Sequence, residues 1–408
     1  MNALMSYLEQ MVWVKALLED YAVVPYAALI AAALVALEAF RRAPLSENTR
    51  MAILLAISVI TIAWLDRRSA YLMTLLTCIV YLIEKSKIDY KKYVPLLTAL
   101  SVFGLISTKA MFANWTPSPL IVLGLSYYVL RLISVVIEVG RKNPDYAEIK
   151  ALPFFTYIFF LPIFFAGPVQ RYADFRRVDV DEKFAPWLYT RMALLIVLKM
   201  AVVDFLLLQA IIMPIRTNLV PVVLSWTVPA RLGLFVGHGF ISIVYHYLDF
   251  VLYTELAKTF GRLLGYHVID NFNYPLLATS IADFWRRWHM SLSNWARDYV
   301  FMPVMVRSRR IWLGSYVTML MIGLWHSFNL NWFIWAIAHG TALVSYDRLR
   351  RSSFYRNMNS SPRSARVLSI TGWLLTLCFI GSVNNLIAFP LDYSLAWKFA
   401  RQALLGLP

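Results

Sequence analysis

The sequence predicts an all-α, polytopic membrane protein. Of its 408 residues, 60% are hydrophobic and only 15% are charged, whereas soluble domains hold roughly 45–50% apolar and about 25% charged residues. The apolar stretches are long and do not alternate with polar residues, which favours helices over the strands of a membrane barrel. Helices also satisfy the backbone hydrogen bonds that lipid cannot supply.

About eleven apolar segments are candidate transmembrane helices. The segment 51–65 is short for a bilayer, so we expect a tilted helix or one that begins earlier. Regions 165–186 and 257–310 are too polar to span and too apolar for free loops. We expect them to be re-entrant or interfacial, around a central tunnel. The whole chain, 1–408, is predicted to form one membrane domain. The candidate spans are 21–40, 51–65, 69–84, 93–110, 118–138, 151–169, 187–213, 228–256, 311–327, 329–346 and 366–388.

Basic loops predict the orientation in the membrane. In the first 165 residues most Lys and Arg residues of the loops fall on one side, and Arg67 and Arg68 beside Asp66 fall on the other. The more basic side should be cytoplasmic, which would leave the N-terminus extracytoplasmic. The net charge of +16 is explained by basic loop residues that bind anionic lipid headgroups. A nucleic-acid partner is therefore not expected. We therefore expect a multi-pass protein of the plasma or inner membrane. The basic residues on the predicted cytoplasmic side are Arg41, Arg42, Arg50, Lys85, Lys87, Lys91, Lys92, Arg141, Lys142 and Lys150.

Ionisable residues inside apolar spans are candidates for function, because lipid makes them costly. His326 and His339 both lie in such spans. Each is either a functional group or a packing residue whose hydrogen bonds are satisfied within the protein. Asp249, in "YHYLDFVLY", is either part of a polar strip that lines a tunnel or a buried carboxylate held by tyrosines and an arginine. The cysteines, Cys78 and Cys378, indicate neither a disulfide framework nor a metal site.

The segment "DFWRRWHMSLSNWARDYVF" (283–301) is the densest polar cluster in the chain. Its tryptophans and arginines fit an interfacial helix at headgroup depth. That interpretation does not explain His289, nor the carboxylates of Asp283 and Asp298. Ser291 adds a small polar group, suited to a wet cavity.

These segments together resemble the membrane-bound O-acyltransferase family. The matching residues are "NFNYPLLATSIADFWRRWHMSLSNWARDYVFMPV" (271–304) and "GLWHSFNLNWFIWAIAHG" (323–340), with Trp-His following the first histidine by 37 residues. "FFAGPVQRYADF" (164–175) and "YLDFVLYTELAKTFGRLLGY" (247–266) also resemble family segments. The likeness covers most of 120–345, the predicted core. It points to a bacterial branch whose members acetylate alginate or transfer D-alanine to teichoic acid.

The resemblance implies acyl transfer from a thioester to a hydroxyl, with His326 as the catalytic histidine and His289 as its upstream companion. Ser327 stands where the family usually has glycine. An alcohol needs a base to accept its proton, and neutral imidazole buried in an apolar span suits this role. The tunnel and substrate-binding candidates are Asp283, Trp285, Arg286, Trp288, Ser291, Asp249, Trp325 and Ser327. For the oxyanion, His289, the indole N–H of Trp288, Ser291 and backbone N–H groups remain alternatives.

No tightly bound cofactor is expected. The donor would be acyl-CoA or an acyl-carrier protein with a phosphopantetheine thioester, and the acyl group D-alanyl or acetyl. The acceptor would be a hydroxyl of a cell-envelope polymer or an extracytoplasmic partner protein. The alternatives are a transporter or flippase of a lipid-linked intermediate, and a non-catalytic scaffold for envelope enzymes.

Overall fold

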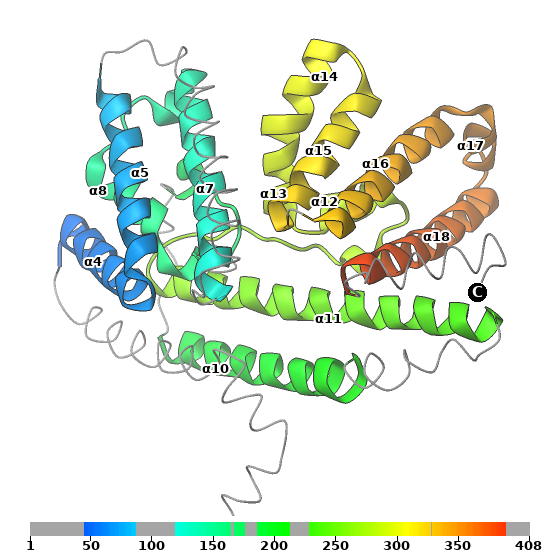
Figure 1. Cartoon of the computed structure of the whole chain (residues 1–408), viewed down its shortest axis with the longest axis horizontal. Helices are drawn as coiled ribbons and strands as arrows, with labels where there is room; N and C mark the ends of the chain where they lie inside the picture. Colours follow the sequence, from blue (N-terminus) through cyan, green and yellow to red (C-terminus); the bar gives the residue numbers. More distant parts are fainter. Residues whose placement is uncertain are drawn as a thin grey trace, which may run out of the picture. The chain divides into compact units, whose positions relative to one another are not determined.

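The computed structural model describes residues 45–86, 119–164, 167–175, 186–212, 228–327 and 329–388. These residues form helices and turns, and no strand occurs among them (Figure 1), as the composition predicts. They divide into two compact units. The first contains the described residues up to Ala210 together with Leu248–Asp270, and the second contains Ile211–Tyr247 and the described residues from Asn271 onward.

The first unit contains a helical pair that is separated by a single capping residue. Asp66 ends one helix, and its carboxylate accepts hydrogen bonds from the backbone N–H groups of Arg68 and Ser69 at the start of the next. This arrangement satisfies donors that a helix start leaves without partners. This unit holds the end of α11 (Val228–Leu263) from Leu248 onward. The α-helices that lie wholly within it are α4 (Glu47–Leu65), α5 (Arg67–Lys85), α7 (Pro119–Gly140), α8 (Ala151–Phe159), α9 (Tyr172–Phe175) and α10 (Pro186–Val203).

An aromatic core surrounds Tyr157 in the first unit. Its ring lies 5.4 Å from that of Tyr172 and 5.5 Å from that of Phe175, measured between centroids. Its hydroxyl donates to the carbonyl of Gln170, and its own carbonyl accepts from the guanidinium of the fully buried Arg131. The stretch 167–175 is therefore held against α8 by the buried side chain of Tyr157.

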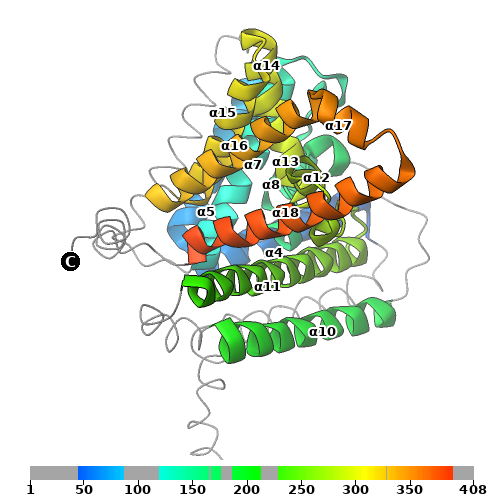
Figure 2. The same ribbon diagram turned by 90° about the vertical axis from the view of Figure 1, so that its right-hand side faces the viewer.

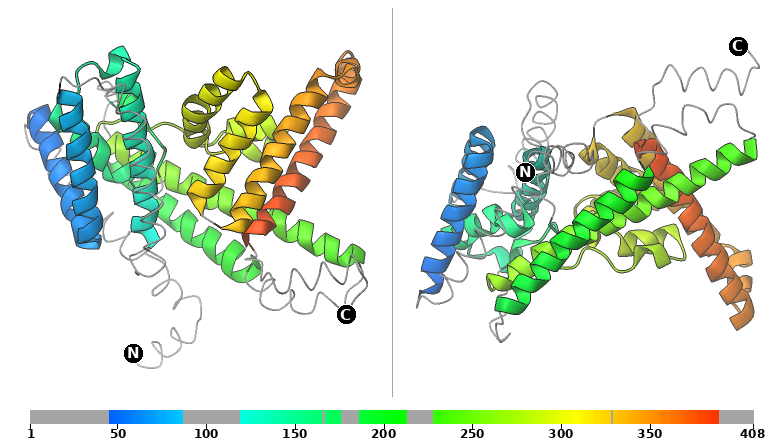
Figure 3. Two further views of the ribbon diagram at one scale, coloured as in Figure 1. Left: turned by 45° about the horizontal axis from the view of Figure 1, so that its top comes forward. Right: turned by 90° about the horizontal axis from the view of Figure 1, so that it is seen from below.

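The second unit holds a helical hairpin and the short helices that lead into it. Figure 3 shows α15 (Ile311–His326), α16 (Leu330–Arg351) and α18 (Pro362–Ala388) side by side, and Figure 2 shows the turn at α17 (Ser353–Met358). Gly323 permits the tight packing of α15 on α16, because a Cβ there would lie 2.7 Å from the Trp332 carbonyl oxygen. The preceding short elements are α12 (Ile281–Arg287), α13 (Met290–Ala296), η8 (Arg297–Phe301) and α14 (Met302–Ser308).

Four helices of the described part are long and apolar enough to cross a bilayer: Glu47–Trp64, Arg191–Ile212, Phe235–Arg262 and Pro362–Asn385. Candidate spans 69–84, 118–138, 311–327 and 329–346 coincide with α5, α7, α15 and α16. The spans predicted at 21–40 and 93–110 lie outside the described residues. The total of about eleven, the central tunnel and the single domain stay predictions.

Two predicted segments have a different local structure. The span expected at 151–169 is not one helix, because α8 ends at Phe159 and a 3-10 turn, Leu161–Ile163, follows with Pro162 inside it. Proline lacks the N–H that would continue the helix. In the region 257–310, residues 257–263 belong to the end of a long helix, and α13, η8 and α14 follow one another without a break from Met290 to Ser308. The expectation that this region is re-entrant or interfacial stays a prediction.

A glycine crossing joins α11 (Val228–Leu263) to α18, and we expect alanine there to destabilise the protein. A Cβ at Gly239 would lie 2.0 Å from the carbonyl oxygen of Gly381, whereas a Cβ at Gly237 would meet nothing within 4 Å. Gly239→Ala should therefore lower the free energy of unfolding by roughly 1–3 kcal/mol. Gly237→Ala should raise it by up to about 1 kcal/mol through helix propensity. Thermal unfolding of the purified variants in detergent measures the difference, and equal melting temperatures would contradict the crossing.

Candidate active site

The junction between α12 and α13 is held by an extended segment that runs beside it. The N–H of Met290 donates to the Asn271 carbonyl at 2.8 Å, and the N–H of Asn273 donates to the Arg287 carbonyl at 2.9 Å. Between these two bonds lies His289, with φ 43° and ψ 53°. This left-handed backbone conformation is uncommon outside glycine. The local structure thus fixes the direction in which the His289 side chain leaves the backbone.

The side chain of Asn271 determines the tautomer of His289. Asn271 is completely buried, and its Oδ1 accepts from the Ser291 hydroxyl at 2.6 Å and from the Ser291 N–H at 3.3 Å. A backbone N–H can only donate, so the amide atom that faces it must be the oxygen. His289 Nδ1 lies 3.2 Å from the same oxygen. It therefore carries a proton and donates it, and the neutral ring keeps its lone pair on Nε2.

His289 is held in the neutral state by its surroundings. It is 2% exposed. Burial lowers the pKa of His289 well below its usual value, and the nearby positive charge that His326 can carry lowers it further. A neutral ring in this tautomer cannot donate from Nε2. The hydroxyl of Ser291 is likewise committed to Asn271, so neither side chain is a donor for an oxyanion in this arrangement.

His326 ends α15 and lies in a cluster of tryptophans. Its ring stacks on that of Trp332 with centroids 4.3 Å apart and an angle of 11°, and lies 4.7 Å from that of Trp325. Trp325 also lies near His289, and the centroids of these two rings are 6.4 Å apart. Trp325, itself 5% exposed, therefore contacts both histidines. The two imidazoles that the sequence selected belong to one site.

The expectation that other side chains bury His326 is wrong, whereas its position in an apolar helix is confirmed and its depth in the membrane stays a prediction. The residue is exposed, because it is the last residue of α15 and the chain turns before α16 begins at Leu330. Burial instead falls on His289. Exposure leaves the ring of His326 accessible to a second molecule, and the stacked indole of Trp332 restricts its orientation.

The third histidine of this region, His339, is a packing residue. It is 2% exposed, and its Nδ1 accepts a hydrogen bond from the indole N–H of Trp285 at 3.3 Å. Rings of Trp335 and Phe379 lie 4.2 Å and 5.1 Å away. Trp285, predicted to bind substrate, is itself buried and spends its only donor on His339. Both residues are therefore buried and paired with each other, and the role of Trp285 in substrate binding stays a prediction.

Other predicted binding residues are placed less centrally. Asp283 receives hydrogen bonds from the Thr279 N–H, from Arg286 and from Arg287. Burial raises the pKa of Asp283, but the hydrogen bonds from Arg287, Thr279 and Arg286 outweigh it, so the net pKa is lowered. The carboxylate thus stays charged and stabilises α12 through its hydrogen bonds to Arg286 and Arg287. The side chain of Arg286 is 72% exposed.

The remaining two predicted residues are Trp288, which immediately precedes His289, and Asp249. The ring of Trp288 stacks on Phe284 with centroids 5.3 Å apart. Asp249 belongs to the part of α11 that falls in the first unit, so the geometry of the second unit neither includes nor excludes it.

Two residues of this site were not singled out from the sequence. Asn271 and Trp332 both lie within the segments that carry the family resemblance, at "NFNY" and "LNWF". The signal for Asn271 was a polar amide in a segment too apolar for a free loop. The signal for Trp332 was its position six residues after His326, across a turn. Neither pattern says which side chain the residue contacts.

Ser327 does not occupy a position that demands glycine, so we expect Ser327→Gly to be tolerated. Its φ of −160° is extended backbone, which any residue adopts. Its hydroxyl accepts from the side-chain amide of Asn329 at 3.1 Å, and Asn329 caps α16 by accepting from the Trp332 N–H. Replacement should cost about 0.5–1 kcal/mol of stability and leave acyl transfer within a few-fold of wild type. Abolished transfer in a variant that remains folded would instead give the hydroxyl a chemical role.

Comparisons with known proteins agree with the resemblance. A family model described as MBOAT, membrane-bound O-acyltransferase family, matches residues 51–384. The chain is 30% identical over 296 residues to the probable alginate O-acetylase AlgI of Azotobacter vinelandii, covering 67% of this chain and 55% of that protein. It is 27% identical over 372 residues to the teichoic acid D-alanyltransferase of Streptococcus thermophilus, covering 84% of this chain and 86% of that protein.

A shorter match links it to the peptidoglycan O-acetyltransferase of Helicobacter pylori, at 30% identity over 160 residues, 38% of this chain and 26% of that protein. The chain spans about half the length of the alginate O-acetylases it matches. The family match, in contrast, covers most of the chain and includes α12 to α16 with both histidines. The chain belongs to the membrane-bound O-acyltransferase family.

Proposed function

We propose that this chain transfers an acyl group, D-alanyl or acetyl, from a thioester donor made in the cytoplasm to a hydroxyl of a cell-envelope polymer. The observation that carries the proposal is that a buried, neutral His289 and an exposed His326 both contact the ring of Trp325. The relatives add support, because their names describe transfer to alginate, teichoic acid and peptidoglycan.

In the proposed reaction, His326 is the general base. Its imidazole accepts the proton of the acceptor hydroxyl as the oxygen attacks the thioester carbonyl carbon. The resulting tetrahedral intermediate collapses as the carbon–sulfur bond breaks, and the departing thiolate takes up the proton from the imidazolium. An ester and a free thiol result, and no acyl-enzyme is required. His289 would orient one substrate group by accepting a hydrogen bond at Nε2.

The oxyanion needs donors worth a few kcal/mol in total. The hydrogen bonds of His289 and Ser291 to Asn271 argue against these two side chains. The candidates that remain are the indole N–H of Trp288 and backbone N–H groups. Trp288 ends α12, one residue before His289, which favours it for this role.

The charge on the α15–α16 hairpin supports an orientation for the site. Six exposed arginines lie at the end of the hairpin where α15 begins and α16 ends, with Asp347 as their acidic partner. By the positive-inside rule this end would be cytoplasmic. His326 lies at the other end of α15, about 24 Å away along the helix, and would face the acceptor side. The arginines are Arg307, Arg309, Arg310, Arg348, Arg350 and Arg351.

Mass spectrometry of envelope polymers tests the proposal. Cells that produce the chain should carry polymers heavier by one acyl group per modified unit than cells that lack it, and the mass difference distinguishes acetyl from alanyl. Complementation with the wild-type chain should restore the modification. Identical polymers in both strains, with the protein present in the membrane, would refute acyl transfer to this class of acceptor.

A further inference from the structure

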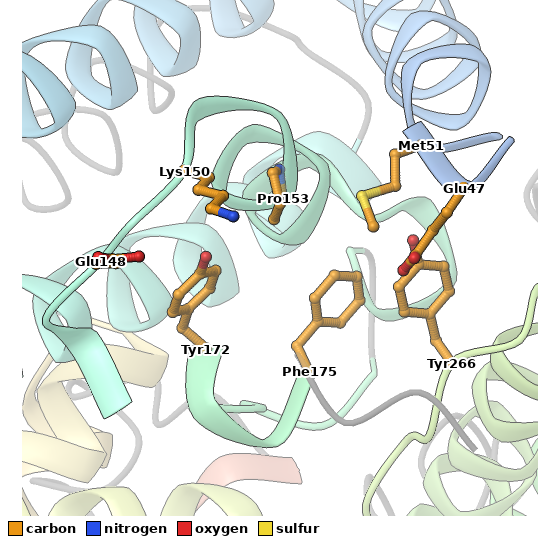
Figure 4. A pocket seen from close by; sticks show the side chains of 8 residues that line it. All are labelled: Glu47, Met51, Glu148, Lys150, Pro153, Tyr172, Phe175 and Tyr266. Atoms are coloured by element: carbon orange, nitrogen blue, oxygen red, sulfur yellow. The ribbon is translucent and has the colours of Figure 1, made fainter. Parts of the chain in front are cut away.

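A pocket of about 270 Å³ in the first unit is not explained by the proposed reaction. Figure 4 shows its lining, which comes from the first turn of α4, from the segment that leads into α8, from α9 and from the stretch after α11. Charged and aromatic side chains predominate. The lining residues are Glu47, Met51, Glu148, Lys150, Pro153, Tyr172, Phe175 and Tyr266.

Two acidic side chains and one basic side chain line this pocket and form no ion pair with one another. Glu47, Glu148 and Lys150 are exposed, and none of them forms an ion pair with a described residue. The lining therefore carries two carboxylates and one ammonium. A ligand with charges of both signs can compensate them, whereas a purely anionic ligand meets a net negative lining.

One side of the pocket suits an anionic group. Lys150 is the N-cap of α8 and forms no side-chain capping bond, because an ammonium cannot accept one. The helix start therefore offers the N–H groups of Ala151 and Leu152, whereas Pro153 has none. Helix starts with such donors, next to a lysine ammonium, bind phosphate well. Figure 4 shows the Lys150 ammonium and the Tyr172 hydroxyl turned toward each other on this side.

The other side suits a cation. The rings of Phe175 and Tyr266 stack with centroids 4.5 Å apart and an angle of 9°, and Figure 4 shows the Glu47 carboxylate beside Tyr266. Burial and then the charge of Glu47 raise the pKa of Tyr266 to about 12, which keeps its phenol protonated. A carboxylate next to aromatic faces attracts an ammonium group.

We infer that this pocket binds a zwitterionic ligand that carries a primary ammonium and a phosphate, the chemistry of a phosphoethanolamine headgroup. The volume of about 270 Å³ lies just below the roughly 300–1,000 Å³ of small-molecule sites, so it fits a headgroup and not a whole coenzyme. The pocket also adjoins the start of α8, next to the basic loop predicted to lie at the cytoplasmic membrane surface. A membrane lipid and a soluble phosphoethanolamine compound are the two sources of this chemistry.

Native mass spectrometry of the purified full-length protein tests the inference. Delipidated protein in detergent is titrated with phosphatidylethanolamine, phosphatidylcholine or phosphatidylglycerol, and the bound fraction of each lipid is measured. We expect phosphatidylethanolamine to bind best, because phosphatidylcholine offers no N–H donor and phosphatidylglycerol no cation. Glu47→Gln and Lys150→Gln should each weaken its binding about tenfold, the loss of one charge-assisted hydrogen bond.

Asp145→Asn and Lys142→Gln are the matched controls, since both residues are exposed near the same loop and neither lines the pocket. They should bind like wild type. Equal binding of all three lipids, or unchanged binding by both pocket variants, would overturn the inference. Soluble phosphoethanolamine identifies the source: competition with the lipid shows that the headgroup chemistry suffices, and lack of competition with lipid binding intact assigns the site to membrane lipid.

Discussion

Replacing His326 with alanine is expected to reduce acyl transfer by roughly 10²–10⁴-fold, the usual contribution of a positioned general base. The ring is exposed at the end of α15 and touches Trp332 and Trp325 by its faces and edges. Its removal therefore takes away a proton acceptor without opening a cavity in the core. Acyl content of the envelope polymer, measured in a strain that carries only the variant, gives the size of the loss.

His246→Ala serves as the control for this experiment. His246 is also exposed and lies in the second unit, on α11, where its Nδ1 is paired with the Ser242 carbonyl oxygen. It should retain wild-type transfer. Membrane extraction and gel filtration of both variants establish that they insert and fold. A folded His326→Ala protein with wild-type transfer would remove His326 from the reaction, and a loss confined to His289→Ala would exchange the roles of the two histidines.

Substitutions of Asn271 should have the second largest effect, through His289. Asn271→Ala leaves the hydroxyl and N–H of Ser291 and the Nδ1–H of His289 without their buried acceptor, at about 1–3 kcal/mol for each unsatisfied group. It also releases the ring from the tautomer that puts the lone pair on Nε2. We expect a destabilised protein with strongly reduced transfer, measured by thermal unfolding and by acyl content.

Asn271→Asp separates positioning from folding. The carboxylate can accept the same three hydrogen bonds, so the fold should survive, but its charge raises the pKa of His289. A histidine that must be neutral loses activity as the pH falls through its pKa. A raised pKa therefore moves the acid limb of the pH–rate profile to higher pH. Ser291→Ala, which removes a hydrogen bond without adding charge, should not move the limb, and an unshifted profile for Asn271→Asp would contradict the assigned contact.

Charge repulsion between the two histidines gives a reason why one is buried and the other exposed. Two imidazoles that both ionised would repel each other, and the charge on His326 lowers the pKa of His289. In the proposed reaction His289 stays neutral, and His326 carries the proton of the acceptor hydroxyl until the departing thiolate takes it up.

The Trp-Arg-Arg-Trp-His block and the Trp-His that follows it indicated the site through their family resemblance. Separately, His326 was a candidate because ionisable side chains are costly in lipid. Composition and apolar run length likewise determined the all-α membrane class. The motifs and the apolar run lengths are properties of short stretches of sequence, so they can be recognised without the tertiary structure. The same is true of the turn at Asp66, where one carboxylate caps the second of two apolar helices.

Only the tertiary structure decided which histidine is buried, which way the Asn271 amide faces, and that the indole of Trp285 donates to His339. These facts depend on contacts between residues 18 and 54 positions apart, and no periodicity within one segment encodes such contacts. Burial belongs to the assembled unit: an apolar run around His326 predicted a buried ring, but the end of α15 exposes it, while the extended segment that contains Asn271 covers His289.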